Sequence, residues 1–147
     1  MPESPVQILE VRATGDASPV TITLAVSGDA SQAMLTALSE QLDRRRRLDT
    51  DTVEEVLALR EQTALVERFE PLAAAGAHGM VSLTDSELRG CLLELTAYAD
   101  RVDGEHFQPS ELRERLAVLA EITPTLWDAN AEAADAVEAL REAPSLP

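Results

Sequence analysis

The clearest pattern of hydrophobic and polar positions near the N-terminus is a strict alternation. Every second residue of the segment 20–26 is apolar, which places four side chains on one face of a predicted strand: Val20, Ile22, Leu24 and Val26. The segment 6–13 also begins with an alternation and predicts another strand, and the intervening TGDASP has the composition of a turn. We expect an antiparallel hairpin, whose apolar face must be covered because an isolated hairpin is only marginally stable.

The rest of the chain repeats its apolar positions roughly every three to four residues, which is typical of amphipathic helices. The repeats predict helices over 30–47, 52–75, 85–102, 109–122 and 125–141. The first two could also form one long bent helix if residues 48–50 stay helical. Residues 76–82, GAHGMVS, are predicted to be a flexible connection.

Two prolines fall inside these helical patterns. We expect Pro71 to stop or kink the second helix and Pro124 to separate the last two, because proline removes a helical hydrogen bond. For the last helix, the pattern predicts an apolar stripe that consists of Trp127, Ala131, Ala134, Val137 and Leu140.

The starts of the helices over 85–102 and 109–122 are both specified by local signals, the second by Pro109 at the first helical position and by Glu111. Thr84 with Glu87 forms a capping box, and Leu83 with Leu88 forms the matching hydrophobic staple. Gly104 is suited to end the helix over 85–102. Its predicted buried stripe consists of Leu88, Cys91, Leu92, Leu95, Tyr98 and Val102.

Together these elements predict an α+β fold, in which an N-terminal β-hairpin precedes four or five mostly antiparallel helices. The alternative is a helical bundle from which the hairpin projects. The length of 147 residues fits a single domain over 1–147, with residues 1–5 and 143–147 as disordered tails.

Charge narrows the range of partners. The chain carries 27 acidic residues against 12 basic ones, a formal charge of -15, and every basic residue is arginine. Such a surface repels phosphate backbones and anionic membranes, so we expect no binding to nucleic acid or membrane, and it attracts basic proteins. The N-terminus does not resemble a signal peptide and no apolar run could span a bilayer, so the predicted location is the cytoplasm.

No motif with a catalytic mechanism is present, and we expect no enzyme activity and no cofactor. Three residues could carry chemistry: His78 in a glycine-flanked loop, His106 in a polar turn, and Cys91 on a buried stripe. The acidic turn around Gly104 does not match an EF-hand loop, and zinc ligands are too few, so no metal is predicted. A ligand binder or small enzyme that uses His78 or His106 stays an alternative.

The favoured function is therefore protein–protein interaction, by an oligomeric or accessory subunit. The alternative within binding proteins is an inhibitor or immunity-type protein that blocks a basic partner. The candidate interface residues are Val20, Ile22 and Leu24, through which two copies could pair in a homodimer, the basic run Arg44, Arg45, Arg46 and Arg47, and Trp127. The arginine run also fits a solvated helix end, and Trp127 also fits a core anchor.

Overall fold

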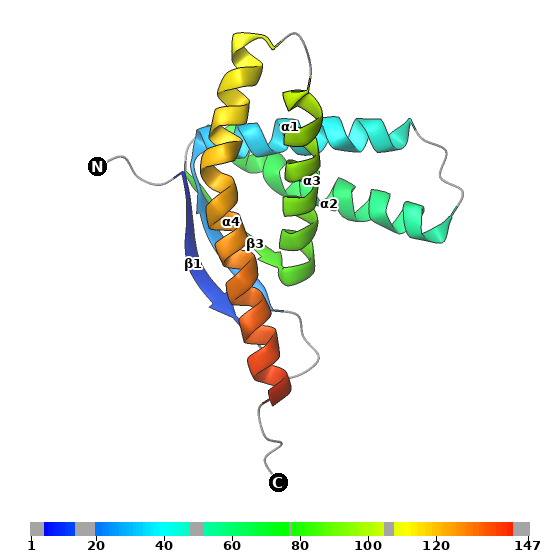
Figure 1. Cartoon of the computed structure of the whole chain (residues 1–147). Coiled ribbons are helices and arrows are strands. Elements are labelled where there is room, and N and C mark those ends of the chain that lie inside the picture. Colours follow the sequence, from blue (N-terminus) through cyan, green and yellow to red (C-terminus); the bar gives the residue numbers. More distant parts are fainter. Residues whose placement is uncertain (1–4, 14–19, 48–51, 77, 105–107, 143–147) are drawn as a thin grey trace.

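The computed structural model describes residues 5–13, 20–47, 52–76, 78–104 and 108–142 (Figure 1). Its elements follow one another as β1 (Val6–Arg12), β2 (Thr21–Val26), α1 (Gly28–Arg46), α2 (Val53–Ala75), β3 (Gly79–Thr84), α3 (Asp85–Asp103) and α4 (Ser110–Glu142). The predicted α+β class and the N-terminal hairpin of β1 and β2 are confirmed. Both predicted tails and His106 lie outside the described residues, apart from Pro5.

β2 is the middle strand of a sheet with the order β1-β2-β3, in which both pairs are antiparallel. Its alternation sets the two faces: Ile22 and Leu24 are fully buried, while Thr21 and Thr23 on the opposite face are partly exposed. The sequence suggested that this strand pairs with a second copy of the chain. That prediction is wrong for this fold, because both edges of β2 are already paired within the chain.

β3 begins within the segment 76–82, for which the sequence predicts a flexible connection because its short alternation lies beside Gly76 and Gly79. Val81 and Leu83 of β3 lie opposite Leu24 and Ile22 and complete the buried face. The outer side of β3 is held by α2, whose Arg68 donates to the carbonyl of Ser82. Tertiary pairing therefore makes a strand of a segment whose local composition favours a loop.

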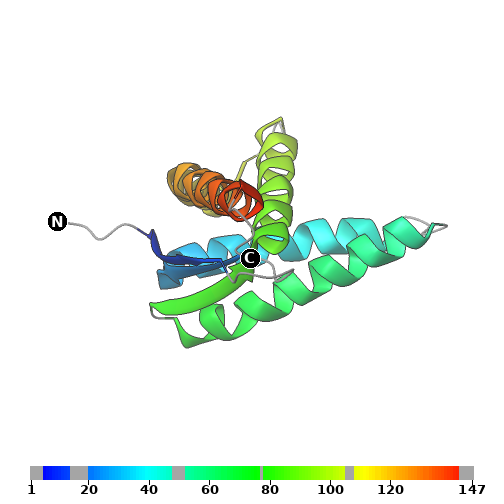
Figure 2. The same cartoon turned by 90° about the horizontal axis from the view of Figure 1, so that it is seen from below.

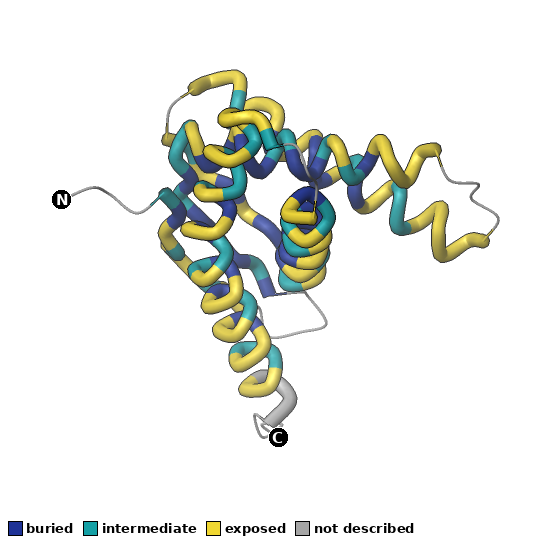
Figure 3. Tube along the Cα trace, turned by 45° about the horizontal axis from the view of Figure 1, so that its top comes forward, coloured by how far each residue is buried: buried dark blue, intermediate teal, exposed yellow. Residues whose placement is uncertain are grey.

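The helices pack on one face and one end of the sheet. α4 packs on β1 and α3 on β3, so that these two helices cover the buried face, as Figures 1 and 2 show. α1 and α2 lie side by side and extend beyond the sheet. The far half of this pair is largely exposed (Figure 3), and the predicted apolar positions Val53, Val56 and Leu57 of α2 lie there on the surface.

The predicted break at Pro124 is wrong: α4 continues through it as one helix. Pro124 and Ala120, whose carbonyl loses its helical donor, are both exposed, so water can bind the freed carbonyl. Residues on both sides of the proline are anchored in the core, including Ile122 and Leu126. Burial of these side chains holds the helix together across the missing hydrogen bond.

The continuous helix also shifts the buried stripe that was predicted for its second half. Ala129 and Ala133 are buried, whereas Trp127, Ala131 and Ala134 are exposed. The reason is that the helical phase is carried over from Leu119 and Ile122 and does not restart after the proline. By contrast, the capping box and the whole predicted stripe of α3 are confirmed.

Candidate functional site: the groove between α3 and α4

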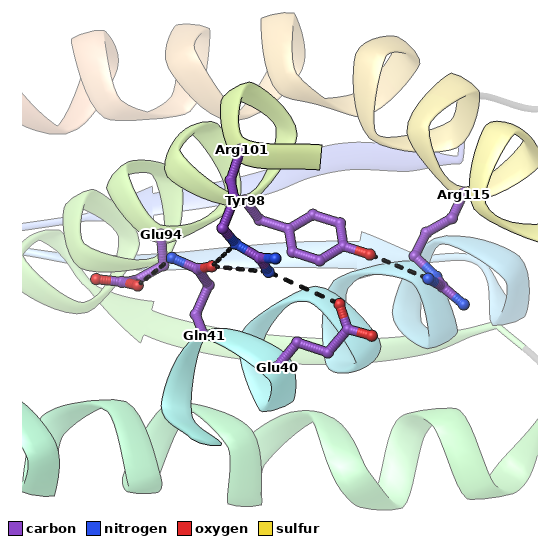
Figure 4. A network of polar contacts seen from close by, with 6 residues as sticks. All are labelled: Glu40, Gln41, Glu94, Tyr98, Arg101 and Arg115. Carbon is purple, nitrogen blue, oxygen red and sulfur yellow. Dashed lines mark hydrogen bonds and ion pairs between the residues drawn. The ribbon is translucent and has the colours of Figure 1, made fainter. Parts of the chain in front are cut away.

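A polar network fixes α3 against α1 and α4 (Figure 4). The buried carboxylate of Glu94 accepts hydrogen bonds from Arg45 at 2.7 Å and from Gln41 at 3.3 Å. The Gln41 side-chain oxygen in turn accepts from the Arg101 guanidinium at 3.3 Å. Glu94 is the buried member of this network, so loss of Arg45 would remove the ion-pair partner of a buried carboxylate, and the network therefore favours one position for α3.

Tyr98 extends this network to α4. Its hydroxyl accepts a hydrogen bond from Arg115 at 3.0 Å, and Arg101 lies over its ring, 5.4 Å from the centroid. Burial raises the pKa of Tyr98, and the hydrogen bond from Arg115 partly offsets this effect. The contacts of Tyr98 therefore hold the C-terminal half of α3 and the N-terminal half of α4 in a fixed relation.

A groove of about 720 Å³ lies between these two helices. It is lined by Leu95, Thr96, Ala99, Asp100 and Asp103 of α3, by Gln108, and by Arg113, Leu116, Ala117, Leu119, Ala120, Thr123, Pro124 and Trp127 of α4. We call it the α3–α4 groove. Its lining positions on both helices recur at helical spacing, as expected for two stripes that face each other.

The groove exists because small side chains occupy its walls. Ala99 faces the furrow from α3, and Ala117 and Ala120 face it from α4. These side chains are too short to fill the space between the helices, while Leu95 and Leu119 below them are buried and form an apolar floor.

Polar groups lie at particular points of this apolar furrow. The hydroxyl of Thr96 is buried and has no hydrogen-bond partner among the described residues. Asp100 and Asp103 contribute two carboxylates near the C-terminal end of α3, and Arg113 contributes one guanidinium. The groove thus combines an apolar floor, an unused hydroxyl and a net negative rim.

Trp127 is the last lining residue along α4 and is 42% exposed. This exposure contradicts the interpretation of Trp127 as a core anchor, because a core tryptophan would be buried, and its role as an interface anchor stays a prediction. A large, rigid, partly exposed indole beside an apolar furrow is a common feature of binding hot spots.

The other predicted interface residues do not contribute to this groove. Val20, Ile22 and Leu24 are in the core, with exposures of 1% or less. Arg45 is held by Glu94, while Arg44 and Arg47 line a separate cavity of about 540 Å³ between α1, α3 and α4. The four arginines are exposed at the C-terminal end of α1, where their positive charge complements the helix dipole.

Of the three candidate chemical residues, His106 lies outside the described residues, and the structure places Cys91 in the core but His78 on the surface. Cys91 is fully buried, and burial together with the nearby Glu94 raises the pKa of its thiol from 9.0 to about 12, so the thiol stays protonated. His78 is exposed beside β3. Within the described ranges, no three His, Cys, Asp or Glu residues lie close enough to hold a metal, and no helix is long and apolar enough to cross a bilayer.

Sequence reasoning identified Trp127 but missed the rest of the groove. The signal was a stripe of small residues at helical spacing, of which Ala117 and Ala120 are the clearest members. The same stripe is equally expected where two helices pack closely, so the sequence alone could not distinguish a groove from a tight contact.

Comparisons of the chain with protein-family models, with curated proteins and with solved structures give no match. The function must therefore be argued from the geometry and chemistry of these residues.

Proposed function

We propose that this protein is a small acidic cytoplasmic interaction module, which binds a basic amphipathic helix of another protein in the α3–α4 groove. The observation that carries the proposal is the apolar furrow that runs to a partly exposed tryptophan in a strongly acidic chain. Recognition of a helix in a groove uses such a surface, with apolar anchors at helical spacing on the ligand.

The shape of the groove favours a helix over a compact small molecule. Its lining runs along α4 from Arg113 to Trp127, which corresponds to about 21 Å at the rise of an α-helix. A ligand helix of roughly four turns would match this length and would complete a three-helix arrangement with α3 and α4. The small side chains of the walls allow the ligand backbone to approach closely.

Charge favours a basic ligand. The rim has two carboxylates, Asp100 and Asp103, against one guanidinium. The exposed side of α4 near Trp127 adds Asp128 and Glu132. Lysine and arginine side chains of a ligand helix would meet these groups, and the net charge of -15 would speed their encounter at low salt.

A second copy of this chain is a poorer occupant, because two chains of charge -15 repel each other. The homo-oligomer predicted from the sequence thus stays a prediction, and the strand on which it relied is internal. The available sheet edge at β1 has a bulge at Leu9 and the charged residues Glu10 and Arg12, which are features that discourage strand addition.

The direct test is a titration with a fluorescent model peptide of leucine and lysine, with the leucines at helical spacing. A scrambled peptide of the same composition is the control for charge alone. We expect peptide anisotropy to rise on binding and the emission of the single tryptophan to shift to shorter wavelength. Binding should weaken strongly between about 50 and 500 mM salt.

Two variants distinguish binding in the groove from non-specific attraction of the peptide to the negative charge of the whole protein. Trp127→Ala should cost about 2 kcal/mol of binding free energy, or roughly thirtyfold in affinity. Met80→Ala is the control, because Met80 is also a large and exposed apolar side chain, 69% exposed, but lies on β3 outside the groove. Equal binding of the scrambled peptide, or equal effects of the two substitutions, would refute the groove as the binding site.

A further inference from the structure

The N-terminal half of α3 borders a second hollow, on the side of α2. This α2–α3 cleft has a volume of about 400 Å³, and its apolar lining includes Leu65 of α2 and Gly90 and Leu93 of α3. Leu93 is 54% exposed at this cleft. The volume lies in the range of small-molecule sites, and the cleft is separate from the α3–α4 groove.

Two residues of this cleft reduce the stability of the fold. Gly90 lies in the interior of α3, where glycine is less favourable than alanine. A Cβ atom at this position would meet only the Leu65 side chain, at 4.0 Å, so sterics do not require glycine here. Gln62 of α2 is only 8% exposed, and its side-chain oxygen has no hydrogen-bond partner among the described residues. Such local costs are expected where a ligand supplies the missing contact.

The polar groups of the cleft define what that ligand must provide. The unpaired Gln62 oxygen is an acceptor and needs a donor. Three carboxylates, Glu61, Glu87 and Glu94, line the same cleft against one guanidinium, Arg45. Arg45 pairs with Glu94 at 2.7 Å.

Of the other two carboxylates of the cleft, one is not neutralised by an ion pair. Glu87 pairs with Arg68 at 3.2 Å, whereas Glu61 has no ion-pair partner among the residues that the structure describes. The cleft therefore presents an apolar wall, a buried acceptor and an uncompensated negative charge.

We propose that the α2–α3 cleft binds a small organic cation, namely a primary amine on a compact apolar body. The ammonium group donates to the Gln62 oxygen and lies within the field of Glu61, while the apolar body packs on Leu65 and fills the space that Gly90 leaves open. Both stability costs are then explained by one occupant. This proposal is independent of peptide binding in the α3–α4 groove.

The test uses 2-phenylethylamine as the probe and 2-phenylethanol as its neutral counterpart, with amide chemical shifts of the full chain as the readout. We expect the amine to shift the Gly90 amide, and the alcohol to bind at least about tenfold more weakly, because the charge contributes to binding. Gly90→Leu should block the cleft and abolish the shifts of the other cleft amides, such as that of Leu93, while Trp127→Ala should leave the shifts of the cleft amides unchanged.

Gln62→Leu is the more specific test, because it should weaken amine binding and at the same time increase the stability of the fold. It should weaken amine binding at least about tenfold and raise the Tm by about 3 °C, since it removes a buried unpaired acceptor. Gln32→Leu, at an exposed position of α1, is the matched control and should leave amine binding unchanged. Absence of amine binding, equal binding by Gln62→Leu, or a lower Tm of that variant would overturn the proposal.

Discussion

The buried hydroxyl of Thr96 offers the most direct test of the packing beneath the α3–α4 groove. It has no hydrogen-bond partner among the described residues, although threonine in a helix commonly donates to the carbonyl four residues earlier. Thr96→Val keeps the branched shape and exchanges the hydroxyl for a methyl group. We therefore expect the substitution to stabilise the fold.

The magnitude follows from the state of the hydroxyl. Leaving a buried polar group unsatisfied costs about 1–3 kcal/mol, and the helix propensities of threonine and valine are similar. We expect Thr96→Val to raise the free energy of unfolding by about 1–2 kcal/mol. For a chain of this length, that corresponds to a rise in Tm of about 3–6 °C.

Thr123 in the same groove is the matched control. Its hydroxyl donates to the carbonyl of Leu119 at 2.5 Å, so Thr123→Val removes a hydrogen bond that exists. We expect this substitution to be neutral or destabilising, within about 1 kcal/mol. Urea unfolding followed by circular dichroism measures both variants, and equal m-values would show that only stability has changed.

The reasoning is refuted if Thr96→Val destabilises the fold, or if the two variants change stability equally. Either result would mean that the Thr96 hydroxyl has a partner in solution, of which the carbonyl of Leu92 is the nearest in sequence at helical spacing. The buried hydroxyl beneath the groove would then no longer count as an unused polar group.

Two further predictions concern Cys91 and Pro124. Folding raises the pKa of the Cys91 thiol from 9.0 to about 12, so its contribution to stability is full below pH 9 and is lost as pH rises from 9 towards 12. At about pH 10 the free energy of unfolding is lower by about 1.4 kcal/mol because of this group. The free energy of unfolding of Cys91→Ala should therefore fall less as the pH rises. Parallel pH profiles of the two proteins would contradict this prediction. Pro124→Ala restores a helical donor to the carbonyl of Ala120 and should raise the free energy of unfolding by about 1–2 kcal/mol. A lower Tm for this variant would show that the proline ring itself contributes to packing.

The local signals in the sequence predicted several elements correctly. Alternation in the segment 20–26 identified the central strand and its buried face, and the capping box of Thr84 with Glu87 identified the start of α3. These features depend on residues close in sequence: the twofold period of a strand, and the free N–H groups of a first helical turn. They could therefore be recognised without knowledge of the rest of the chain.

The candidate sites depended on contacts between distant segments. Thr96 and Ala120 line one groove only because α3 and α4 pack together, and Gln62 and Gly90 meet only because α2 reaches α3. In the sequence, each of these residues is an ordinary helical position. Whether a small side chain leaves a groove, or a buried amide lacks a partner, is decided by the neighbour across the interface.

The difference between local patterns and contacts of distant segments also explains which sequence-based predictions are wrong. The sequence by itself determined the class of fold, the acidic surface and the periodicity of most helices, because these properties are sums or local repeats along the chain. Only the tertiary structure decided that β3 forms, that α4 continues through Pro124 and that β2 has no open edge. In each case, burial and pairing with distant residues outweigh a local preference of a few kcal/mol at most.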